Sequence, residues 1–426
     1  PPGGRVGPAS ASSNVPPVLA EPTEWPAPLR RSLRRMIDLE RVRADTVGVD
    51  DIVHLNNCGS ALPPACVVDA QVDYLRTEQR MGGYEAAVAR GDDLHEFYTQ
   101  TSRMLGCAVD EVAFQGSAIE GWWRAFLSVG LQPGDRVLTG TSEYQGNAFG
   151  LLQARDRGVL VDTVPSDERG TIDLEALARA IDERVRLVCL TQVSMSNGAV
   201  HPAAEVGRIC REATVPFLLD ACQVAGQRPL DVDTLGCDFL VYTGRKFMRG
   251  PRGTGVLYAR RSTVDRLGPS PFVDGRSAVW AGSTTWRHTA GAARFELGER
   301  AFGAQVGFGV ATRYALDIGL DAIAERIGRS SARLRTELDR IDRVAVRDEG
   351  TDRCGIVTFT VDGIAAADVK RALGAVGINI GAPADVNAQW DLGTRGIDAV
   401  ARAGVHYFND DAELDRLVAA VADLTP

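Results

Sequence analysis

The chain has 426 residues, of which 45% are hydrophobic and 24% are charged, and its formal net charge is −9. These values are typical of a globular protein with one large and one smaller domain, and the negative charge argues against general binding of nucleic acid or membrane surfaces. No apolar run reaches the ~18 residues of a membrane span and no charged-then-apolar leader is present. We therefore expect neither a membrane span nor a secretory signal, and the expected partners are small molecules.

The cysteine and histidine patterns bear on compartment and on metal binding. Eight cysteines stand at positions 58, 66, 107, 189, 210, 222, 237 and 354, without a C-x-x-C pair. Several lie inside apolar runs, where a small buried thiol is the usual explanation. The five histidines form no H-x-x-x-H motif and no cluster with cysteine. We expect a reduced, cytoplasmic protein without a metal site.

The first 64 residues divide into two parts. Residues 1–28 are rich in Pro, Gly, Ser and Ala, which predicts a flexible N-terminal arm. Residues 29–64 begin with a helical pattern and contain a short strand that breaks at Pro63 and Pro64. We expect this second part to pack with the smaller domain.

A large α/β domain is predicted over residues 65–300. Amphipathic helical stretches alternate there with short branched apolar runs, which predicts a mainly parallel sheet covered on both faces. Ligands of such sheets bind beyond the carboxyl ends of the strands, so the residues after each run are the ones to inspect. The runs are VAFQ (112–115), RVLTG (136–140), VLVDTV (159–164), VRLVCLTQV (185–193), PFLLDAC (216–222), CDFLVYTG (237–244) and GTGVLYAR (253–260).

Residues 301–426 predict a smaller C-terminal α/β domain. A long helical stretch leads into the apolar runs VAVRD and CGIVTFTVDG, the helix AAADVKRALGAVG, and a final strand and helix. The fold class is therefore α/β, with two domains of unequal size.

The first strand ends carry two ambiguous signals. After VAFQ, Ser117 and Ala118 open a helix, and the free N–H groups of a helix N-terminus suit a phosphate. A plain helix cap explains them equally well. After RVLTG, Tyr144 is placed to stack on a planar ring, although a packed surface tyrosine is the simpler reading.

The later strand ends carry polar and charged residues that can take part in chemistry. The polar turn after VRLVCLTQV contains Asn197, and PFLLDAC includes Asp220, with Gln223 three residues further on. A buried carboxylate in so apolar a run needs a cationic partner, so Asp220 either meets a ligand or caps a helix. The run CDFLVYTG contains Thr243 near its end, and Arg245 and Lys246 follow it directly.

Together these residues match one ligand, pyridoxal 5′-phosphate (PLP). Hydroxyls, an arginine and a helix N-terminus bind a phosphate, Tyr144 stacks on the ring, Asp220 pairs with a protonated ring nitrogen, and Lys246 supplies an amine for a Schiff base. On this reading the phosphate holds Arg245, and Lys246 loses its charge on bonding to the cofactor. The alternative for this pair is a solvated basic patch.

Three motifs show that the sequence resembles the class V aminotransferase-like enzymes of PLP fold type I, from about residue 50 to 420. They are LDACQ (219–223), TGRK followed by GPRGTGVLY (243–258), and RAGVHYFN (402–409). The resemblance implies a PLP-dependent transferase fold and a homodimer with each active site near the subunit interface.

The resemblance also implies individual roles. Lys246 is the Schiff-base lysine, Asp220 lies on the pyridine nitrogen, and Gln223 lies near the phenolic oxygen of the cofactor. Tyr144 stacks where many relatives use histidine, and Asn197 lies beside the ring. Arg402 binds the substrate's α-carboxylate, for which a bidentate guanidinium is well suited.

A closer similarity is to the branch containing hercynylcysteine sulfoxide lyase of ergothioneine biosynthesis and enzymes that process cysteine S-conjugates in lincosamide pathways. It rests on the Arg-Lys pair, MGGYEAA (81–87), SEY (142–144), and FELGE with QVGF within 295–308. Cysteine desulfurases of this class carry a catalytic cysteine on a loop before the C-terminal arginine strand. Residues 378–402 contain no cysteine, so a persulfide-forming desulfurase is not expected.

The sequence thus predicts a PLP-dependent C–S β-lyase acting on an S-substituted cysteine, either a thioether or a sulfoxide, in a sulfur-containing or secondary-metabolite pathway. A decarboxylase or oxidative deaminase, an aminotransferase and an epimerase of an amino acid remain alternatives, since the bond that breaks depends on pocket shape. A non-catalytic PLP-binding regulator is disfavoured because the first 50 residues are too few and too proline-rich for a nucleic-acid-binding domain. A dinucleotide-binding dehydrogenase is disfavoured because GPRGTG runs into a strand instead of opening a helix.

Overall fold

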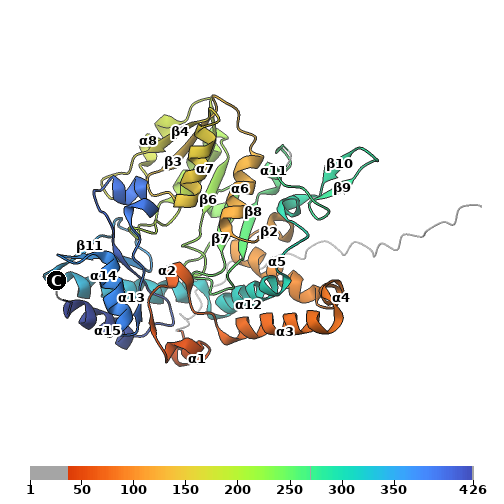
Figure 1. Ribbon diagram of the computed structural model, residues 1–426. Helices are drawn as coiled ribbons and strands as arrows, with labels where there is room; N and C mark the ends of the chain where they lie inside the picture. Colours follow the sequence, from red (N-terminus) through yellow and green to blue (C-terminus); the bar gives the residue numbers. More distant parts are fainter. Residues whose placement is uncertain (1–36, 269, 425–426) are drawn as a thin grey trace, which may run out of the picture. The chain divides into compact units, whose positions relative to one another are not determined.

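The computed structural model describes residues 37–268 and 270–424, so the predicted arm at 1–28 lies outside the described residues. A seven-stranded sheet is the centre of the fold, with strand order β2-β8-β7-β6-β5-β3-β4 (Figure 1). Each of the seven predicted apolar runs contains one of its strands. These are β2 (Val112–Gln115), β3 (Arg136–Gly140), β4 (Leu160–Val164), β5 (Val185–Thr191), β6 (Phe217–Asp220), β7 (Phe239–Thr243) and β8 (Gly255–Ala259).

The sheet is mainly parallel, as predicted. β4, β3, β5, β6 and β7 run parallel to one another, whereas β8 is antiparallel to both β7 and β2. The loop from β7 to β8 is therefore a turn that brings the chain straight back along its neighbour. Lys246 lies in this turn, at the carboxyl end of β7 and beside the end of β6.

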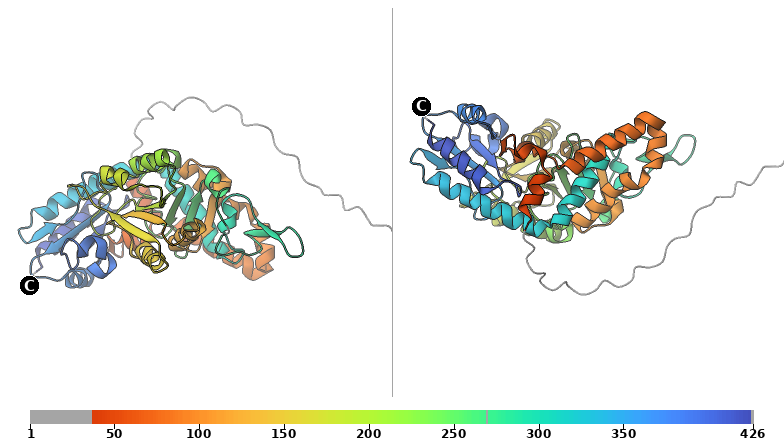
Figure 2. Two further views of the ribbon diagram at one scale, coloured as in Figure 1. Left: turned by 90° about the horizontal axis from the view of Figure 1, so that it is seen from above. Right: turned by 90° about the horizontal axis from the view of Figure 1, so that it is seen from below.

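Successive residues of each strand face opposite sides of the sheet and enter separate cores. In β6, Leu218 packs with the helices of one face while Phe217 and Leu219 pack with those of the other. The first face is covered by α6 (Ala118–Ser128) and α7 (Gln145–Arg155). The second face is covered by α5 (Gly91–Leu105), α8 (Leu174–Ala180), α9 (Ala203–Ala213) and α12 (Phe302–Ile318), and Figure 2 shows helices on both sides of the strands.

A second, three-stranded antiparallel sheet follows α12 in the order β11-β12-β14. Val357, Phe359 and Leu417 belong to its separate core, which the neighbouring helices cover. The elements are α13 (Leu320–Asp339), β11 (Val344–Val346), β12 (Ile356–Val361), α14 (Ala366–Ala375), β13 (Ile378–Asn379), β14 (Ala401–Gly404) and α15 (Asp411–Ala422).

The N-terminal part of the described chain reaches this second sheet region. β1 (Val53–His54) pairs in parallel with β13, with Val53 opposite Ile378. The division into domains at 29–64, 65–300 and 301–426 stays a prediction, since residues 37–424 fall within one compact unit. The other N-terminal helices are α1 (Leu39–Ala44), α2 (Asn57–Ser60), α3 (Ala65–Met81) and α4 (Gly83–Ala89).

The remaining elements are short. The helices α10 (Val232–Leu235) and α11 (Arg261–Val264) flank strands of the large sheet, and the hairpin of β9 (Ala278–Trp280) and β10 (Trp286–His288) follows them. Within the described ranges, no helix combines the length and the apolar character that crossing a membrane requires.

Candidate active site

A cavity of about 230 Å³ lies at the carboxyl ends of the parallel strands, where the sequence placed the site. Its wall brings together eight of the ten predicted site residues, which come from four separate segments of the chain. They are Ser117, Ala118, Tyr144, Asp220, Gln223, Thr243, Arg245 and Lys246.

Lys246 faces this cavity without a hydrogen bond or ion pair to any described residue, and its Nζ lies 5.9 Å from the centroid of the Tyr144 ring. Burial lowers the pKa of Lys246, the neighbouring carboxylate of Asp220 opposes that shift, and the charges of Arg245 and Arg402 add to it. A lysine held in this way is more often a neutral amine, the form that attacks a carbonyl or accepts a proton.

The turn that carries Lys246 is braced from two distant parts of the chain. Arg249 is buried at a φ of 57°, and its guanidinium donates to the Leu62 carbonyl at 2.8 Å and to the Tyr407 hydroxyl at 2.8 Å. Lys246 lies three residues before Arg249. The N-terminal segment and the residues after β14 therefore hold the backbone that carries Lys246 in place.

Asp220 ends β6 and is 4% exposed. Its carboxylate accepts hydrogen bonds from Asn147 Nδ2 at 2.9 Å and from the Cys222 N–H at 2.8 Å. Asn147 also donates to Glu143 at 2.8 Å, and burial raises the pKa of Glu143, with the Asp220 charge contributing to that rise. The amide of Asn147 thus links two buried carboxyl groups and orients Asp220 toward the cavity.

The phosphate side of the predicted site is formed by Ser117, Thr243 and Arg245. Ser117 caps α6, its hydroxyl accepting from the Glu120 N–H at 3.2 Å. Ser117 is therefore a helix cap that also lines the cavity, and its predicted role in binding phosphate stays a prediction. Arg245 donates to the Gly59 carbonyl at 2.6 Å, so one nitrogen of its guanidinium is held by the N-terminal segment.

Sequence reasoning missed one cation of this wall, Arg252. It is exposed, lies on the cavity, and forms no hydrogen bond or ion pair with a described residue. Arg245, Lys246 and Arg252 face the cavity together with a single carboxylate, Asp220, so the described lining carries excess positive charge that suits an anionic ligand. The glycines around Arg252 were the available signal, because Gly253 takes a φ of 76° and turns the chain there.

Two predicted residues do not line the cavity. Asn197 is buried, and its amide donates to Asp391 at 3.1 Å and to Glu349 at 3.2 Å instead of projecting beside a ring. Met195, two residues earlier, takes the place on the wall, because the polar side chains of the turn are directed the other way. Arg402 lies behind Met195 and donates to its carbonyl at 3.1 Å.

Arg402 nevertheless keeps donor capacity for a ligand. Its side chain is 9% exposed, and its Nε has no hydrogen-bond partner among the described residues. A buried guanidinium nitrogen without a partner is unusual in a folded protein. Its charge also acts on Lys246, whose pKa it helps to lower.

Cys222 is the one cysteine of the described chain that lines the cavity. Burial raises the pKa of its thiol well above the ordinary value, and the Asp220 charge raises it further. The thiolate is the nucleophilic form of cysteine, so the raised pKa disfavours Cys222 as a nucleophile.

The chain was compared with known proteins. Residues 53–417 match the family described as "Aminotransferase class-V". A probable cysteine desulfurase of Halobacterium salinarum is 31% identical over 412 residues, covering 90% of this chain and 96% of the relative.

Solved structures show the same fold. The apo cysteine desulfurase of Thermococcus onnurineus has a TM-score of 0.85 at 25% identity, with 91% of this chain and 98% of that chain covered. A C-DES variant with glycine covalently linked to its PLP cofactor has a TM-score of 0.80 at 22% identity, with 90% of this chain and 99% of that chain covered.

Proposed function

This chain belongs to the aminotransferase class-V family, and we propose that it is a C–S β-lyase acting on an S-substituted cysteine. It is a PLP-dependent enzyme of the lyase type. The observation that supports the finer proposal is the composition of one cavity wall. Lys246 and Asp220 share that wall, while its one cysteine among the described residues, Cys222, is a half-buried thiol with a raised pKa.

The residues present fit the cofactor. Gln223 is buried with its Oε1 lacking a hydrogen-bond partner among the described residues, although its Nε2 donates to the Cys58 carbonyl at 3.1 Å. A Cβ at Gly255 would lie 2.5 Å from the Ser117 carbonyl carbon, so glycine there lets β8 run against the first turn of α6. The cavity therefore offers an unused amide oxygen, a helix N-terminus and excess positive charge, which suit a phosphorylated heteroaromatic ring.

Each wall residue then has a task. PLP, when bound, supplies an aldehyde for the substrate's amino group and a ring that accepts electron density from Cα. Asp220 would hold the proton on the ring nitrogen, and Tyr144 would stack on the ring. Ser117, Thr243 and Arg245 would bind the phosphate.

Lys246 is the proton-transfer residue. With the cofactor bound, its Nζ would take the proton from the substrate Cα, which its lowered pKa favours. The electron pair left on Cα forms the Cα–Cβ double bond, and the Cβ–S bond breaks. Sulfur leaves as thiolate from a thioether, or as sulfenate from a sulfoxide.

The overall reaction balances with water alone. An S-substituted cysteine and one water give a thiol, pyruvate and ammonium, and a sulfoxide gives a sulfenic acid in place of the thiol. No oxidant, reductant or protein nucleophile is consumed. The reaction therefore suits a cavity whose single described cysteine has a raised pKa, which disfavours the nucleophilic thiolate.

The relatives named cysteine desulfurases make C–S chemistry the natural class, but this chain differs from the desulfurase pattern. Residues 378–402 contain no cysteine. They instead contain Asp391, which is buried and hydrogen-bonded. A persulfide carried on this part of the chain has no sulfur to form on, so elimination is favoured over sulfur transfer.

The finer assignment follows the closer sequence similarity. The Arg245–Lys246 pair and the motifs at 81–87 and 142–144 favour a cysteine S-conjugate as the proposed substrate, since they resemble the hercynylcysteine sulfoxide lyase branch and the lincosamide-pathway enzymes. A cytoplasmic homodimer with a role in sulfur or secondary metabolism belongs to the same proposal.

The competing PLP reactions differ in their carbon skeletons, which gives the test. The cofactor-loaded protein is incubated with S-methyl-L-cysteine and separately with its sulfoxide, and the products are identified by mass spectrometry. Pyruvate with a released one-carbon sulfur fragment is expected. An amine or aldehyde one carbon shorter means decarboxylation, and an unchanged skeleton with altered nitrogen or Cα configuration means transamination or epimerisation; either result overturns the proposal. Failure to react with both compounds, when cofactor is bound, also counts against it.

A further inference from the structure

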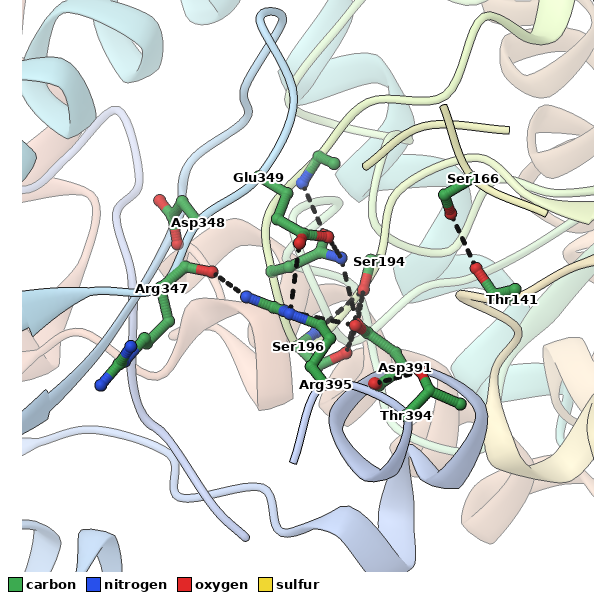
Figure 3. Close-up of polar contacts among 12 residues, drawn as sticks. Thr141, Ser166, Ser194, Ser196, Arg347, Asp348, Glu349, Asp391, Thr394 and Arg395 are labelled. Atoms are coloured by element: carbon green, nitrogen blue, oxygen red, sulfur yellow. Dashed lines mark hydrogen bonds and ion pairs between the residues drawn. The ribbon is translucent and has the colours of Figure 1, made fainter. Parts of the chain in front are cut away.

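A buried carboxylate ties residues 384–398 to the turn at 194–197 (Figure 3). Asp391 lies in the single π-helical turn Gln389–Gly393 and is 5% exposed. Its Oδ2 accepts from the Ser194 hydroxyl at 3.1 Å, from the Ser196 hydroxyl, and from Asn197 Nδ2 at 3.1 Å. One oxygen thus gathers three donors from a stretch of four residues.

The same carboxylate is neutralised from its other side. Arg395 Nη1 lies 3.3 Å from Asp391 Oδ1, and Arg395 Nε lies 3.2 Å from Glu349 Oε1. Arg395 also donates to the Arg347 carbonyl at 2.8 Å, and Figure 3 shows its guanidinium between the two acids. A buried charge that is both paired and fully hydrogen-bonded is stable, whereas removal of the carboxylate leaves its donors unpaired.

This cluster touches the cavity through one residue. Met195 stands between the two serines that donate to Asp391, and it lines the cavity. Its carbonyl accepts from Arg402 Nη1 at 3.1 Å. The position of the Met195 peptide therefore sets the position of the guanidinium, whose Nε remains without a described partner.

The opposite end of the segment is attached beside the other wall residue, Tyr144. Gln145 follows Tyr144 directly, and its Nε2 donates to the Val386 carbonyl at 2.7 Å. The segment 384–398 is consequently fixed at two points that flank the cavity, one next to Tyr144 and one next to Met195.

We propose that Asp391 is a positioning residue for substrate: its bonds to Ser194 and Ser196 set the Met195 carbonyl, and through it the Arg402 guanidinium that receives the substrate's α-carboxylate. The proposal rests on the role of Arg402 in the proposed function. Asp391 itself touches neither cofactor nor reacting atoms, so its effect is on recognition of the carboxylate and not on the cofactor or on amine binding.

The test compares two ligands that differ only by the carboxylate. L-Alanine and ethylamine have no leaving group at Cβ, and each is titrated into cofactor-loaded protein while the cofactor absorbance is followed. Asp391→Asn is expected to raise the Kd of L-alanine about tenfold and to leave that of ethylamine within about twofold. Asp398→Asn is the matched control, because Asp398 is an exposed carboxylate of the same segment with no side-chain partner among the described residues.

An equal rise in the Kd of both ligands overturns the proposal, because a general loss of structure weakens the binding of both. No change in either Kd also overturns it. If Asp391→Asn does not fold, the double variant Ser194→Ala/Ser196→Ala decides, because it keeps the carboxylate and removes two donors. It is expected to show the same selective loss for L-alanine. Neither ligand reports on C–S cleavage, so failure of the lyase assay leaves this test intact.

Discussion

Two regions beside the cavity differ in whether their polar groups have hydrogen-bond partners. In the lysine wall, which we define as residues 220–223 and 243–254, Lys246 and Arg252 form no hydrogen bond or ion pair with a described residue, and Gln223 Oε1 has no partner. In the turn wall, residues 194–197 with the segment 384–398, the polar side chains satisfy one another. Groups left without partners are the ones a ligand completes, and groups already paired hold the shape that the ligand meets.

The largest expected effect comes from removing the amine of the lysine wall. Lys246→Ala is expected to lower the C–S cleavage rate by about 10⁴-fold, at the upper end of what a proton-transfer residue supplies, because the chain then lacks both its Schiff-base amine and its base. The rate is measured by pyruvate release with saturating cofactor.

The chain offers an unusually clean control for this variant. It contains two lysines, and the other, Lys370, is exposed on α14. Borohydride reduction is expected to fix cofactor to the wild type and to Lys370→Ala, but not to Lys246→Ala. Cofactor fixed at Lys370, or retained activity in Lys246→Ala, contradicts the assignment.

The second effect concerns the carboxylate of the lysine wall. Asp220→Asn keeps the size of the side chain and its site beside Asn147, but it removes the charge that stabilises a protonated ring nitrogen. We expect kcat for pyruvate formation to fall about 10²- to 10³-fold. Stopped-flow measurement of a single turnover checks this, and a change of less than about threefold removes Asp220 from the mechanism.

We expect the stability of the fold near the turn wall to fall in acid. His201 lies four residues after this turn, and its Nδ1 accepts from the Ile172 N–H at 3.1 Å. Burial lowers the pKa of His201 to about 4 from the ordinary 6.5, with the charges of Asp391 and Asp167 opposing the shift. Between these two pH values the unfolded chain binds the proton more readily, so stability is full above pH 6.5 and falls toward pH 4.

The expected loss from His201 is about 3 kcal/mol in total, of which about 2 kcal/mol is lost by pH 5. In His201→Asn, the amide oxygen can accept the same N–H without titrating, so we expect a flatter decline than in the wild type. Denaturant midpoints at pH 7.5, 6 and 5 give the comparison. Parallel declines in the two proteins show that His201 does not carry the acid sensitivity.

The smallest expected effect tests the free cation that sequence reasoning missed. Arg252→Ala is expected to raise the Kd of PLP about tenfold and to leave that of pyridoxal, which lacks the phosphate, nearly unchanged. Equilibrium binding to the cofactor-free protein measures both. Arg371→Ala, at an exposed arginine of α14, is the control. An equal loss for both compounds places Arg252 away from the phosphate.

The difference between the two walls also explains what the sequence could predict. Asp220, Thr243, Arg245 and Lys246 follow apolar strands directly, so the α/β pattern alone places them at one edge of the sheet. Each of these residues lies at the end of its strand or within a few residues of it, and the fold confirms these strands. Arg252 was less visible because it lies within a glycine-rich turn without an apolar pattern of its own.

The turn wall depends on contacts between distant positions. Asp391 and Ser194 are 197 residues apart in the chain. No strand or helix period relates them, and a lone aspartate in a loop is ordinarily a solvated residue. The choice between Asn197 and Met195 as the wall residue likewise depends on the backbone direction within one turn, which a sequence pattern does not specify. The pairing became visible only once both segments were placed in space.

The central claim is that Lys246 drives elimination without a cysteine nucleophile. The most direct measurement identifies the three-carbon product of S-methyl-L-cysteine with the wild type, Cys222→Ala and Lys246→Ala. Pyruvate and methanethiol are predicted from the wild type and from Cys222→Ala, and neither from Lys246→Ala. Alanine with sulfur retained on the protein, abolished by Cys222→Ala, would contradict the account and make the protein a sulfur-transferring enzyme.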